Sequence, residues 1–495
     1  TVFEGRYGGV SKAVVGAHAE GFNTDSTGVA ILGTFSTEPV PTAAYAAVRN
    51  LLAWKLALHG VDPTATITAG GISVRTISGH RDLNSTDCPG EMAEGVVPAL
   101  RSDVAASIGA TYHPLSPVRV LDTRNGTGAA AAPVGPGATI DLKVAGVGGV
   151  PASGVAAVVL NVTAADVTAP LSFLTVWPKG ATRPTASNLN FGPGRPVANL
   201  VTTRVGTAGG ISLYNDTGTV GVVADVQGWY SDSATSGSSY VPVNPARLLD
   251  TRTGTGVGGA VAPVGPGGTL QLAVTGVGGV PTTGVTAVVL NMTVDRATGP
   301  ESYLSVWPNG SARPTASNLN FTSGAPATNL VIAQVGGDGR VAIYNHAGST
   351  DVIADVEGWF TAPAARPTGS TYFPISPSRI LDTRSGTGTG GAVGPIGGNA
   401  TMDVTVAGAG GVPATGVTSV VLNVTATDAT GPDSYLTVFP TGTARPLASN
   451  LNFGARQTIP NLVIVRVLNG KVSLFNNLGS TNLVADVQGW FSPGP

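Results

Sequence analysis

Residues 119–124 read Arg-Val-Leu-Asp-Thr-Arg, and this stretch decides the architecture because it occurs three times. The same motif, changed only at its second position, returns at residues 247–252 and 379–384. A period of about 130 residues is far longer than that of a solenoid repeat, so each copy is predicted to be a whole domain.

Two further motifs repeat in step with the first one. Ala-Ser-Asn-Leu-Asn-Phe occurs unchanged at residues 186–191, 316–321 and 448–453. Ala-Asp-Val-x-Gly-Trp closes each copy, at Trp229, Trp359 and Trp490.

Within each copy, short apolar segments alternate with Gly, Pro and Asn turns, and no helical pattern interrupts them. Seven or eight such strands in one copy predict an all-β antiparallel sandwich. In the first copy the predicted strands are residues 139–144, 157–163, 173–177, 189–191, 199–205, 211–214 and 220–226.

Composition excludes several classes of partner. The 495 residues carry a net charge of −2, and only 11% of them are charged, which gives no electrostatic basis for binding nucleic acid or acidic membranes. No apolar run reaches the roughly 20 residues that span a bilayer. We therefore expect no nucleic-acid partner and no membrane span.

The first 108 residues differ from the repeats and have an α/β texture. Residues 28–35 are typical of a short buried strand, and residues 42–59 of a helix that ends before Gly60. A second helix is expected after Pro89-Gly90, through Met92, Val96, Leu100 and Val104. The apolar stripe predicted for the first helix consists of Ala44, Ala47, Leu51, Trp54 and Leu58.

One constellation in this region has clear chemical meaning: Gly-His80-Arg-Asp, followed by Thr86-Asp-Cys88-Pro-Gly. A neutral imidazole and a thiolate are both good zinc ligands, and a tight loop can bring His80 and Cys88 to one ion. The N-terminus of the following helix would stabilise the thiolate. The structural alternative is a buried apolar Cys88 and a turn histidine at His80.

The order of several segments resembles one family. Phe-Glu-Gly-Arg at 3–6, Val-Gly-Ala-His-Ala-Glu-Gly-Phe-Asn at 15–23, the residues at 26–29 and 33–35, and the His80–Cys88 segment resemble the type 2 N-acetylmuramoyl-L-alanine amidases. That family shares a fold with the peptidoglycan recognition proteins. The resemblance covers roughly residues 1–106 and implies a partial α/β amidase domain.

The resemblance implies a zinc site and a substrate groove. His80 and Cys88 match two of the three Zn²⁺ ligands, and Thr86 matches a residue that stabilises the reacting oxygen. His18 and Asn23 match groove residues that contact muramic acid and the stem peptide. The implied reaction is attack of a zinc-activated hydroxide on the amide between N-acetylmuramic acid and L-alanine. Non-catalytic recognition proteins typically lack the zinc cysteine, so Cys88 favours the enzyme.

The family's first zinc histidine and its catalytic tyrosine fall before Thr1. Within the sequence, His18 is the candidate for a third ligand. We expect these residues to be part of a longer secreted precursor; a cleaved piece that stays associated, or a non-catalytic remnant, are the alternatives.

The polar residues of the repeats are mostly Asn, Asp and Thr at strand ends, where they are expected to hydrogen-bond backbone groups. A carbohydrate or calcium site using Asp122 and Asp225 is the alternative. Arg119 and Arg124 are expected to form an ion-pair cluster with Asp122. The repeated tryptophans are interpreted as packing residues rather than sugar platforms.

The repeats resemble uncharacterised modules of secreted actinobacterial proteins, which implies an extracellular, cell-wall-associated location. Three functions stay open: a peptidoglycan amidase held at the envelope, a non-cleaving recognition protein, and a structural or filament protein. The repeats could form a stalk, an array for peptidoglycan or other envelope glycans, or, through edge strands, homo-oligomers and fibres. The expected domains are residues 1–109, 110–231, 240–360 and 371–492.

Overall fold

The computed structural model describes residues 2–5, 14–24, 26–59, 61–232, 237–363 and 369–493, so the motif residue Arg6, the helix stop Gly60 and the side chain of Leu58 lie outside it. The chain forms two compact units, which are described separately: one runs up to Thr111, and the other holds the three repeats between Tyr112 and Pro493. Among the described helices, none is both long and apolar enough to cross a membrane.

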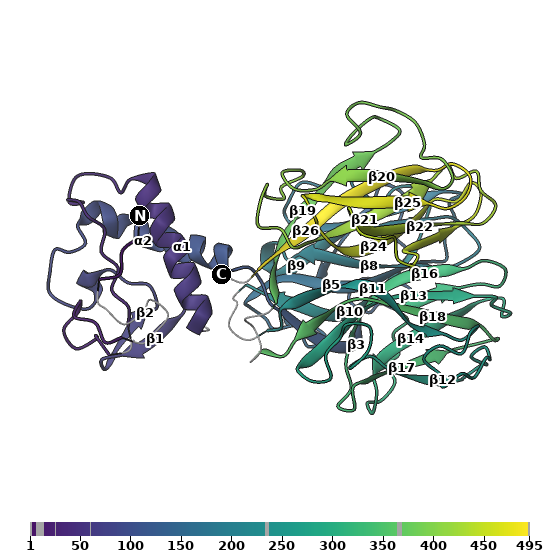
Figure 1. Ribbon diagram of the computed structural model, residues 1–495, viewed down its shortest axis with the longest axis horizontal. Helices are drawn as coiled ribbons and strands as arrows, with labels where there is room; N and C mark the ends of the chain where they lie inside the picture. The colour runs from purple at the N-terminus through teal and green to yellow at the C-terminus, as the bar shows by residue number, and fades with distance from the viewer. Residues whose placement is uncertain are drawn as a thin grey trace. The chain divides into compact units, whose positions relative to one another are not determined.

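The described residues of the N-terminal unit form two helices, a hairpin and a short 3-10 turn (Figure 1). Helix α1 (Thr42–His59) and helix α2 (Glu91–Ile108) confirm the two predicted helices. Strands β1 (Thr66–Ala69) and β2 (Ile72–Arg75) pair with each other, and the 3-10 turn η1 covers His80–Asp82. The buried core of this unit consists of Ala53, Ile77, Val97, Leu100, Val104 and Ile108.

The face of α1 that joins this core is not the predicted stripe but the face beside it. Tyr45, Val48, Leu52, Leu56 and Ala57 pack on the core. The helix is apolar around most of its circumference, so its spacing alone is compatible with both faces, and packing against α2 selects one.

The strand predicted at residues 28–35 is wrong. This segment has no strand, and Val29 and Leu32 are 37% and 94% exposed. Among the described residues, β1 and β2 pair only with each other and offer this segment no partner. An apolar sequence can indicate a strand, but it forms one only when a neighbour satisfies its backbone.

Each repeat consists of two layers of four antiparallel strands whose inward side chains share one apolar core, which confirms the predicted antiparallel β-rich fold. We call these layers the inner and the outer sheet. The inner sheets of the second and third repeats pair at Tyr240 and Ser370 and so form one continuous eight-stranded sheet. In the first repeat the inner sheet is β3 (Tyr112–Asp122), β10 (Gly221–Ser231), β5 (Val155–Ala165) and β8 (Val197–Arg204). Its outer sheet is β4 (Thr139–Lys143), β9 (Gly210–Asn215), β6 (Ser172–Pro178) and β7 (Leu189–Phe191).

The other two repeats keep the same order of strands. The second has β11 (Tyr240–Asp250), β18 (Asp351–Thr361), β13 (Val285–Asp295) and β16 (Ala327–Gln334) inside, with β12 (Thr269–Ala273), β17 (Arg340–Asn345), β14 (Ser302–Pro308) and β15 (Leu319–Phe321) outside. The third has β19 (Ser370–Asp382), β26 (Asn482–Pro493), β21 (Ser419–Thr427) and β24 (Ile459–Arg466) inside, with β20 (Ala400–Thr405), β25 (Lys471–Asn476), β22 (Ser434–Pro440) and β23 (Leu451–Phe453) outside.

The repeats are not independent domains in a row. They pack on one another through the edge strands β8, β16 and β24 (Figure 1). One buried asparagine on each edge strand makes two bonds to one neighbouring repeat: it donates to an asparagine there and accepts a backbone N–H from the same repeat. Each repeat thus gives and receives the same bonds, so the ring is closed. The donor pairs are Asn199–Asn423 (2.8 Å), Asn329–Asn161 (2.8 Å) and Asn461–Asn291 (3.1 Å); the backbone pairs are Leu200–Asn329, Leu330–Asn461 and Leu462–Asn199.

Buried aromatic rings form a second closed set of contacts between repeats. The first tyrosine of each repeat packs on the last aromatic ring of another repeat, with centroids 4.4 to 4.6 Å apart. Tyr112 also donates its hydroxyl proton to the carbonyl of Gln227 at 3.0 Å, and its ring lies over Gly228, where a Cβ would approach Oη to 2.3 Å. This contact explains the glycine of the third motif. The inter-repeat pairs are Tyr112–Phe360, Tyr240–Phe491 and Tyr372–Tyr230.

The repeated motifs also build an ion-pair cluster, as predicted. Arg119 contacts Asp225 at 2.6 Å and Asp122 at 3.1 Å, and Arg124 contacts Asp122 at 2.8 Å. A guanidinium therefore bridges the two carboxylates that the sequence offered as a cation site. Trp229 is a packing residue: it stacks on His113 with centroids 3.9 Å apart and covers the edge of the core.

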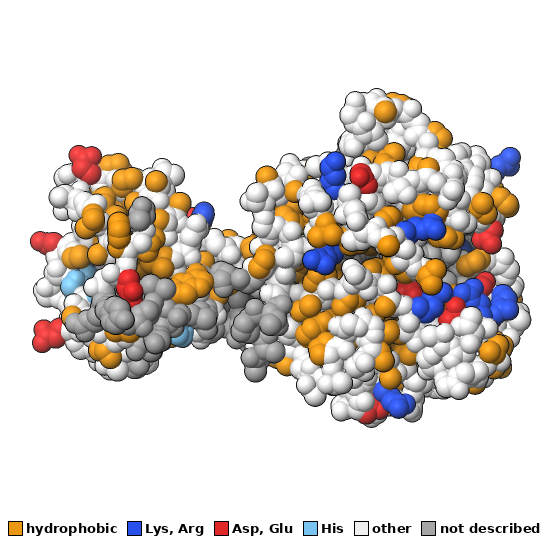
Figure 2. Space-filling view, in the orientation of Figure 1, with side chains coloured by type: hydrophobic (Ala, Val, Ile, Leu, Met, Phe, Trp, Pro, Cys, Tyr) orange, Lys and Arg blue, Asp and Glu red, His pale blue; other side chains and the backbone are white. Residues whose placement is uncertain are grey.

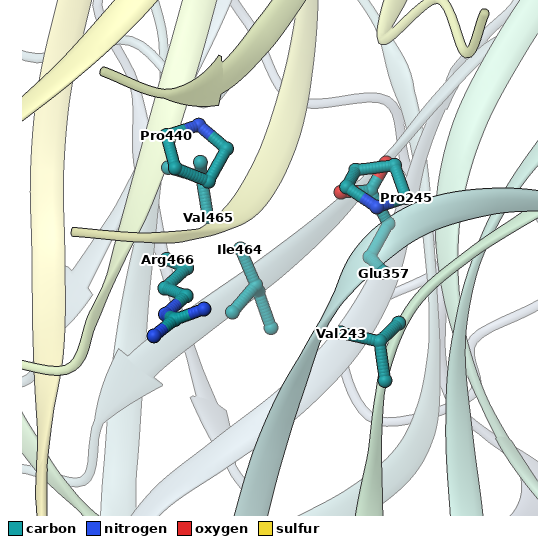
Figure 3. Close-up of a pocket in the computed structure, with 7 residues that line it drawn as sticks. All are labelled: Val243, Pro245, Glu357, Pro440, Ile464, Val465 and Arg466. Carbon is teal, nitrogen blue, oxygen red and sulfur yellow. The ribbon is translucent and has the colours of Figure 1, made fainter. Parts of the chain in front are cut away.

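One position breaks the threefold pattern. Glu357 stands where the other repeats have Gln227 and Gln488, and it is buried at the contact between the second and third repeats (Figure 3). Its Oε1 accepts a hydrogen bond from Asn450 at 3.0 Å. Burial, then the charge of Asp355, raises the pKa of Glu357 to about 8. The pocket around it is lined by Val243, Pro245, Pro440, Ile464, Val465 and Arg466.

Candidate functional site

The predicted zinc ligands lie in the loop between β2 and α2. His80 opens the turn η1, whose start is fixed by Asp82, because the Asp82 carboxylate accepts the N–H of Gly79 at 3.0 Å. The N–H of Arg81 then donates to the carbonyl of Cys88 at 2.9 Å. This bond closes the loop and returns Cys88 beside the turn that carries His80.

The side chain of Arg81 holds this loop against α2. Its Nη1 contacts Glu91 in the first turn of the helix at 2.9 Å, and its Nη2 donates to the carbonyl of Asp87 at 2.9 Å. An exposed ion pair of this kind adds little stability by itself. Its consequence is positional, because it fixes the residues on both sides of Cys88.

Cys88 is exposed, so the structural alternative of a buried apolar cysteine is wrong. His80 is half-buried and Thr86 is exposed. The Thr86 Oγ1 accepts the N–H of Cys88 at 3.2 Å, which orients the hydroxyl and leaves its own proton to donate.

His18 lies in a second loop, with its ring packed between two glycines. A Cβ at Gly16 would lie 2.1 Å from Nδ1 and one at Gly28 2.4 Å from Cγ, so neither position has room for a side chain. The ring Nε2 is 2.8 Å from Oγ of Ser26, and that hydroxyl donates its proton to the carbonyl of Phe22. The bond between His18 and Ser26 therefore places the imidazole proton on Nε2.

His18 and His80 lie close enough for their charges to interact. Burial first, and the charge of His80 second, lower the pKa of His18 below its ordinary value of 6.5. The lowered pKa favours the neutral form of His18.

Asn23 shapes the same loop from inside. Its Oδ1 accepts the backbone N–H groups of His18 at 2.7 Å and of Ala19 at 3.0 Å. Asn84 joins this loop to the zinc-ligand loop, because its Nδ2 donates to the carbonyl of Glu20 at 3.2 Å. The structure therefore brings all five predicted site residues onto two adjoining loops.

The donor types present fit zinc, but only two of the predicted ligands share a loop. Over the described residues, no group of three His, Cys, Asp or Glu side chains is placed to hold a metal ion. His18 does not join such a group, and its Nε2 bonds Ser26 instead.

Sequence reasoning missed the residues that build this arrangement. Arg81 could have been found by its place directly after His80, because a side chain there can reach the rest of the loop. No sequence signal connects Ser26 to His18, or Asn84 to the loop of Asn23, because those contacts depend on how two distant loops fold.

Known proteins are similar to the N-terminal unit. The family described as N-acetylmuramoyl-L-alanine amidase matches residues 3–91. Peptidoglycan-recognition protein LB of Drosophila melanogaster is 32% identical over 84 residues, which cover 17% of this chain and 32% of that protein. Peptidoglycan-recognition protein SC2 of the same organism is 34% identical over 89 residues, covering 18% of this chain and 41% of that protein. The chain therefore spans less than half the length of these relatives.

Solved structures add nothing to the fold assignment of the repeats. A turret protein of an archaeal virus, described as a triple jelly roll, aligns with 78% of this chain and 91% of its own, at 8% identity and a TM-score of 0.18. A likeness of that size carries no argument about fold or function.

Proposed function

We propose that the N-terminal unit is a zinc-dependent peptidoglycan amidase domain that hydrolyses the amide between N-acetylmuramic acid and L-alanine. The observation that carries the proposal is the loop closed by Arg81 and Cys88, which brings a half-buried His80 and an exposed Cys88 together. This loop lies within the segment that matches the amidase family.

His80 and Cys88 are the residues that would hold zinc, together with a further ligand. Zinc bound there would polarise the substrate carbonyl and lower the pKa of a bound water. Thr86 would donate its hydroxyl proton to the oxyanion; the N–H of Cys88 that its oxygen accepts supports this role. One such donor changes kcat by about 10²- to 10³-fold in other hydrolases.

His18 and Asn23 are the proposed substrate contacts. With Oδ1 of Asn23 occupied by two backbone N–H groups, its Nδ2 is the group left to donate to a carbonyl of the stem peptide. His18, whose lowered pKa favours the neutral form and whose ring is fixed between two glycines, offers a rigid ring face rather than a charge.

For the whole chain we propose a secreted, cell-wall-associated protein of actinobacterial type. The amidase domain would occupy residues 1–109, and sandwich domains residues 110–231, 240–360 and 371–492, with the closed ring of repeats holding the enzyme at the envelope. Two sheets around one core in each repeat support the sandwich assignment.

A second candidate function is binding of peptidoglycan without cleavage. It is favoured by the lack, among the described residues, of a three-ligand group for a metal. The names of the two Drosophila relatives, which are recognition proteins, agree with it.

One experiment separates the two functions. The full-length protein is incubated with purified peptidoglycan, with added zinc or with a chelator, and newly exposed L-alanine amino groups are counted. The amidase predicts zinc-dependent release that is lost in Cys88→Ser and His80→Ala and kept in His59→Ala, a matched change at an exposed histidine. No release with zinc supplied rejects the amidase, and sedimentation with peptidoglycan would then support recognition.

A further inference from the structure

Each outer sheet carries an arginine stacked on an aromatic ring. The arginine belongs to the loop after β6, β14 or β22, and the ring belongs to β9, β17 or β25. The distances from Cζ to the ring centroid are 3.6 Å for Arg183 over Tyr214, 3.7 Å for Arg313 over Tyr344 and 3.6 Å for Arg445 over Phe475. We call these the three stacks.

A second aromatic ring lies beside each stack, on β6, β14 or β22. Its centroid is 6.1 to 6.3 Å from that of the first ring, and the pairs are Phe173–Tyr214, Tyr303–Tyr344 and Tyr435–Phe475. These rings alternate along their strands with core residues such as Leu174 and Leu213, so they point to the outer face of the sheet.

The three arginines are exposed, and in the described parts of the chain none of their guanidinium groups makes a hydrogen bond or an ion pair. The motif arginines behave differently: Arg119, for example, is bound by two carboxylates. The stacks therefore leave their N–H donors available to a ligand.

The arginine is retained in all three copies although nearby exposed positions change freely. Lys143 of the first repeat corresponds to Ala273 and Thr405, whereas Arg183 corresponds to Arg313 and Arg445. Internal packing explains retention of buried residues, but these side chains are exposed. Retention at an exposed site points to a ligand.

We propose that the three stacks are equivalent binding sites for anionic oxygen groups, carboxylate or phosphate, carried on cell-wall glycan polymers; the choice of this carrier rests on the proposed function. A guanidinium presents planar donors that match both groups bidentately. Stacking on the ring holds that plane in place and so reduces the entropy lost on binding. The neighbouring aromatic ring supplies an apolar surface for the carrier of the anion.

Bulk charge does not account for such binding. The chain has a net charge of −2, and Figure 2 shows basic side chains as separate groups on the visible face of the repeats, with no continuous basic surface there. Affinity would therefore come from discrete sites. Three equivalent sites on one closed unit give avidity toward a polymer network.

The test compares two triple variants of the full chain. Arg183→Ala/Arg313→Ala/Arg445→Ala removes the stacks, and Arg204→Ala/Arg340→Ala/Arg466→Ala is the matched control, with one exposed arginine lost per repeat and the same charge change. Sedimentation with purified wall sacculi measures Kd, on sacculi that keep their phosphate-bearing polymers and on sacculi extracted to leave only peptidoglycan carboxylates. Both variants carry His80→Ala, so that substrate is not consumed.

We expect the stack variant to raise Kd by about tenfold or more and the control by less than about twofold. Loss only on unextracted sacculi identifies phosphate as the ligand, and loss on both identifies carboxylate. Equal binding by the stack variant and the parent, or equal loss in the control, overturns the proposal. Arg→Lys at the three positions keeps the charge but removes the planar pair of N–H donors, so it should also weaken binding. Amidase activity is measured separately on chains that keep His80, so failure of the binding proposal and failure of the proposed amidase function are distinguished.

Discussion

Replacing Glu357 by glutamine should stabilise the protein at alkaline pH and leave it unchanged at acid pH. The carboxyl is buried between the second and third repeats, with Asn450 as its hydrogen-bond donor, and both other repeats have glutamine at this position. The change keeps the size of the side chain and an oxygen for Asn450, and it removes only the ability to ionise.

The expected change in the free energy of unfolding follows from the raised pKa of Glu357. Burial raises the pKa of Glu357 from 4.5 to about 8, which corresponds to about 5 kcal/mol as an upper limit. Below pH 4.5 the folded and unfolded chains are both protonated, and the folded state bears no cost. Between pH 4.5 and about 8 only the unfolded chain ionises, so stability falls by about 1.4 kcal/mol per pH step, and above pH 8 the loss is complete.

Urea unfolding of the full chain near pH 5 and above pH 8, followed by the circular dichroism of the β-sheets, measures this difference. Glu357→Gln should raise the free energy of unfolding by several kcal/mol above pH 8 and by little near pH 5. Gln227→Glu, the mirror change at the equivalent position of the first repeat, should create a second pH-dependent loss. A Glu357→Gln effect that is the same at both pH values, or absent from both, would refute the reasoning.

Three further predictions concern the ring and the site. Asn199→Ala should lower the free energy of unfolding by about 3 kcal/mol in urea melts, because its two buried partners in the third repeat, Asn423 and the N–H of Leu462, lose their hydrogen bonds. Gly228→Ala should cost about 1–3 kcal/mol in the same assay, since the new Cβ would meet the Tyr112 ring; the further change Tyr112→Ala should remove that clash and make the two substitutions non-additive. His80→Ala should raise the pKa of His18 in an NMR titration, because a nearby positive charge is lost, and an unchanged value would contradict their proximity.

The sequence located both helices and most strands of the repeats, but it missed β1, β2 and β3 and the contacts between repeats. The spacing of apolar residues located α1, α2 and most strands of the repeats, because burial of one face of an element requires apolar residues at regular intervals. It failed at residues 28–35, where an apolar segment has no strand to pair with among the described residues. It also could not show that Tyr112 packs both on Tyr230 of its own repeat and on Phe360 of the next, because identical copies offer identical partners.

For the candidate site too, the sequence predicted some features and only the fold shows the others. The spacing of His80 and Cys88 predicted a shared loop, since eight residues between a strand and a helix leave few paths. The bond that closes the loop, from Arg81 to the Cys88 carbonyl, is a backbone contact that no side-chain pattern records. The proton position on His18 follows from Ser26 and Phe22, which only the fold brings together.

The closed ring of asparagines has a consequence for how this chain can change its length. An open tandem array gains or loses a copy by unequal recombination without harm, because each new unit only extends the row. Here the third repeat donates to the second and accepts from the first, so a fourth copy would find no place in the circle. A lost copy would expose two unsatisfied edges. The number three is therefore a property of the geometry.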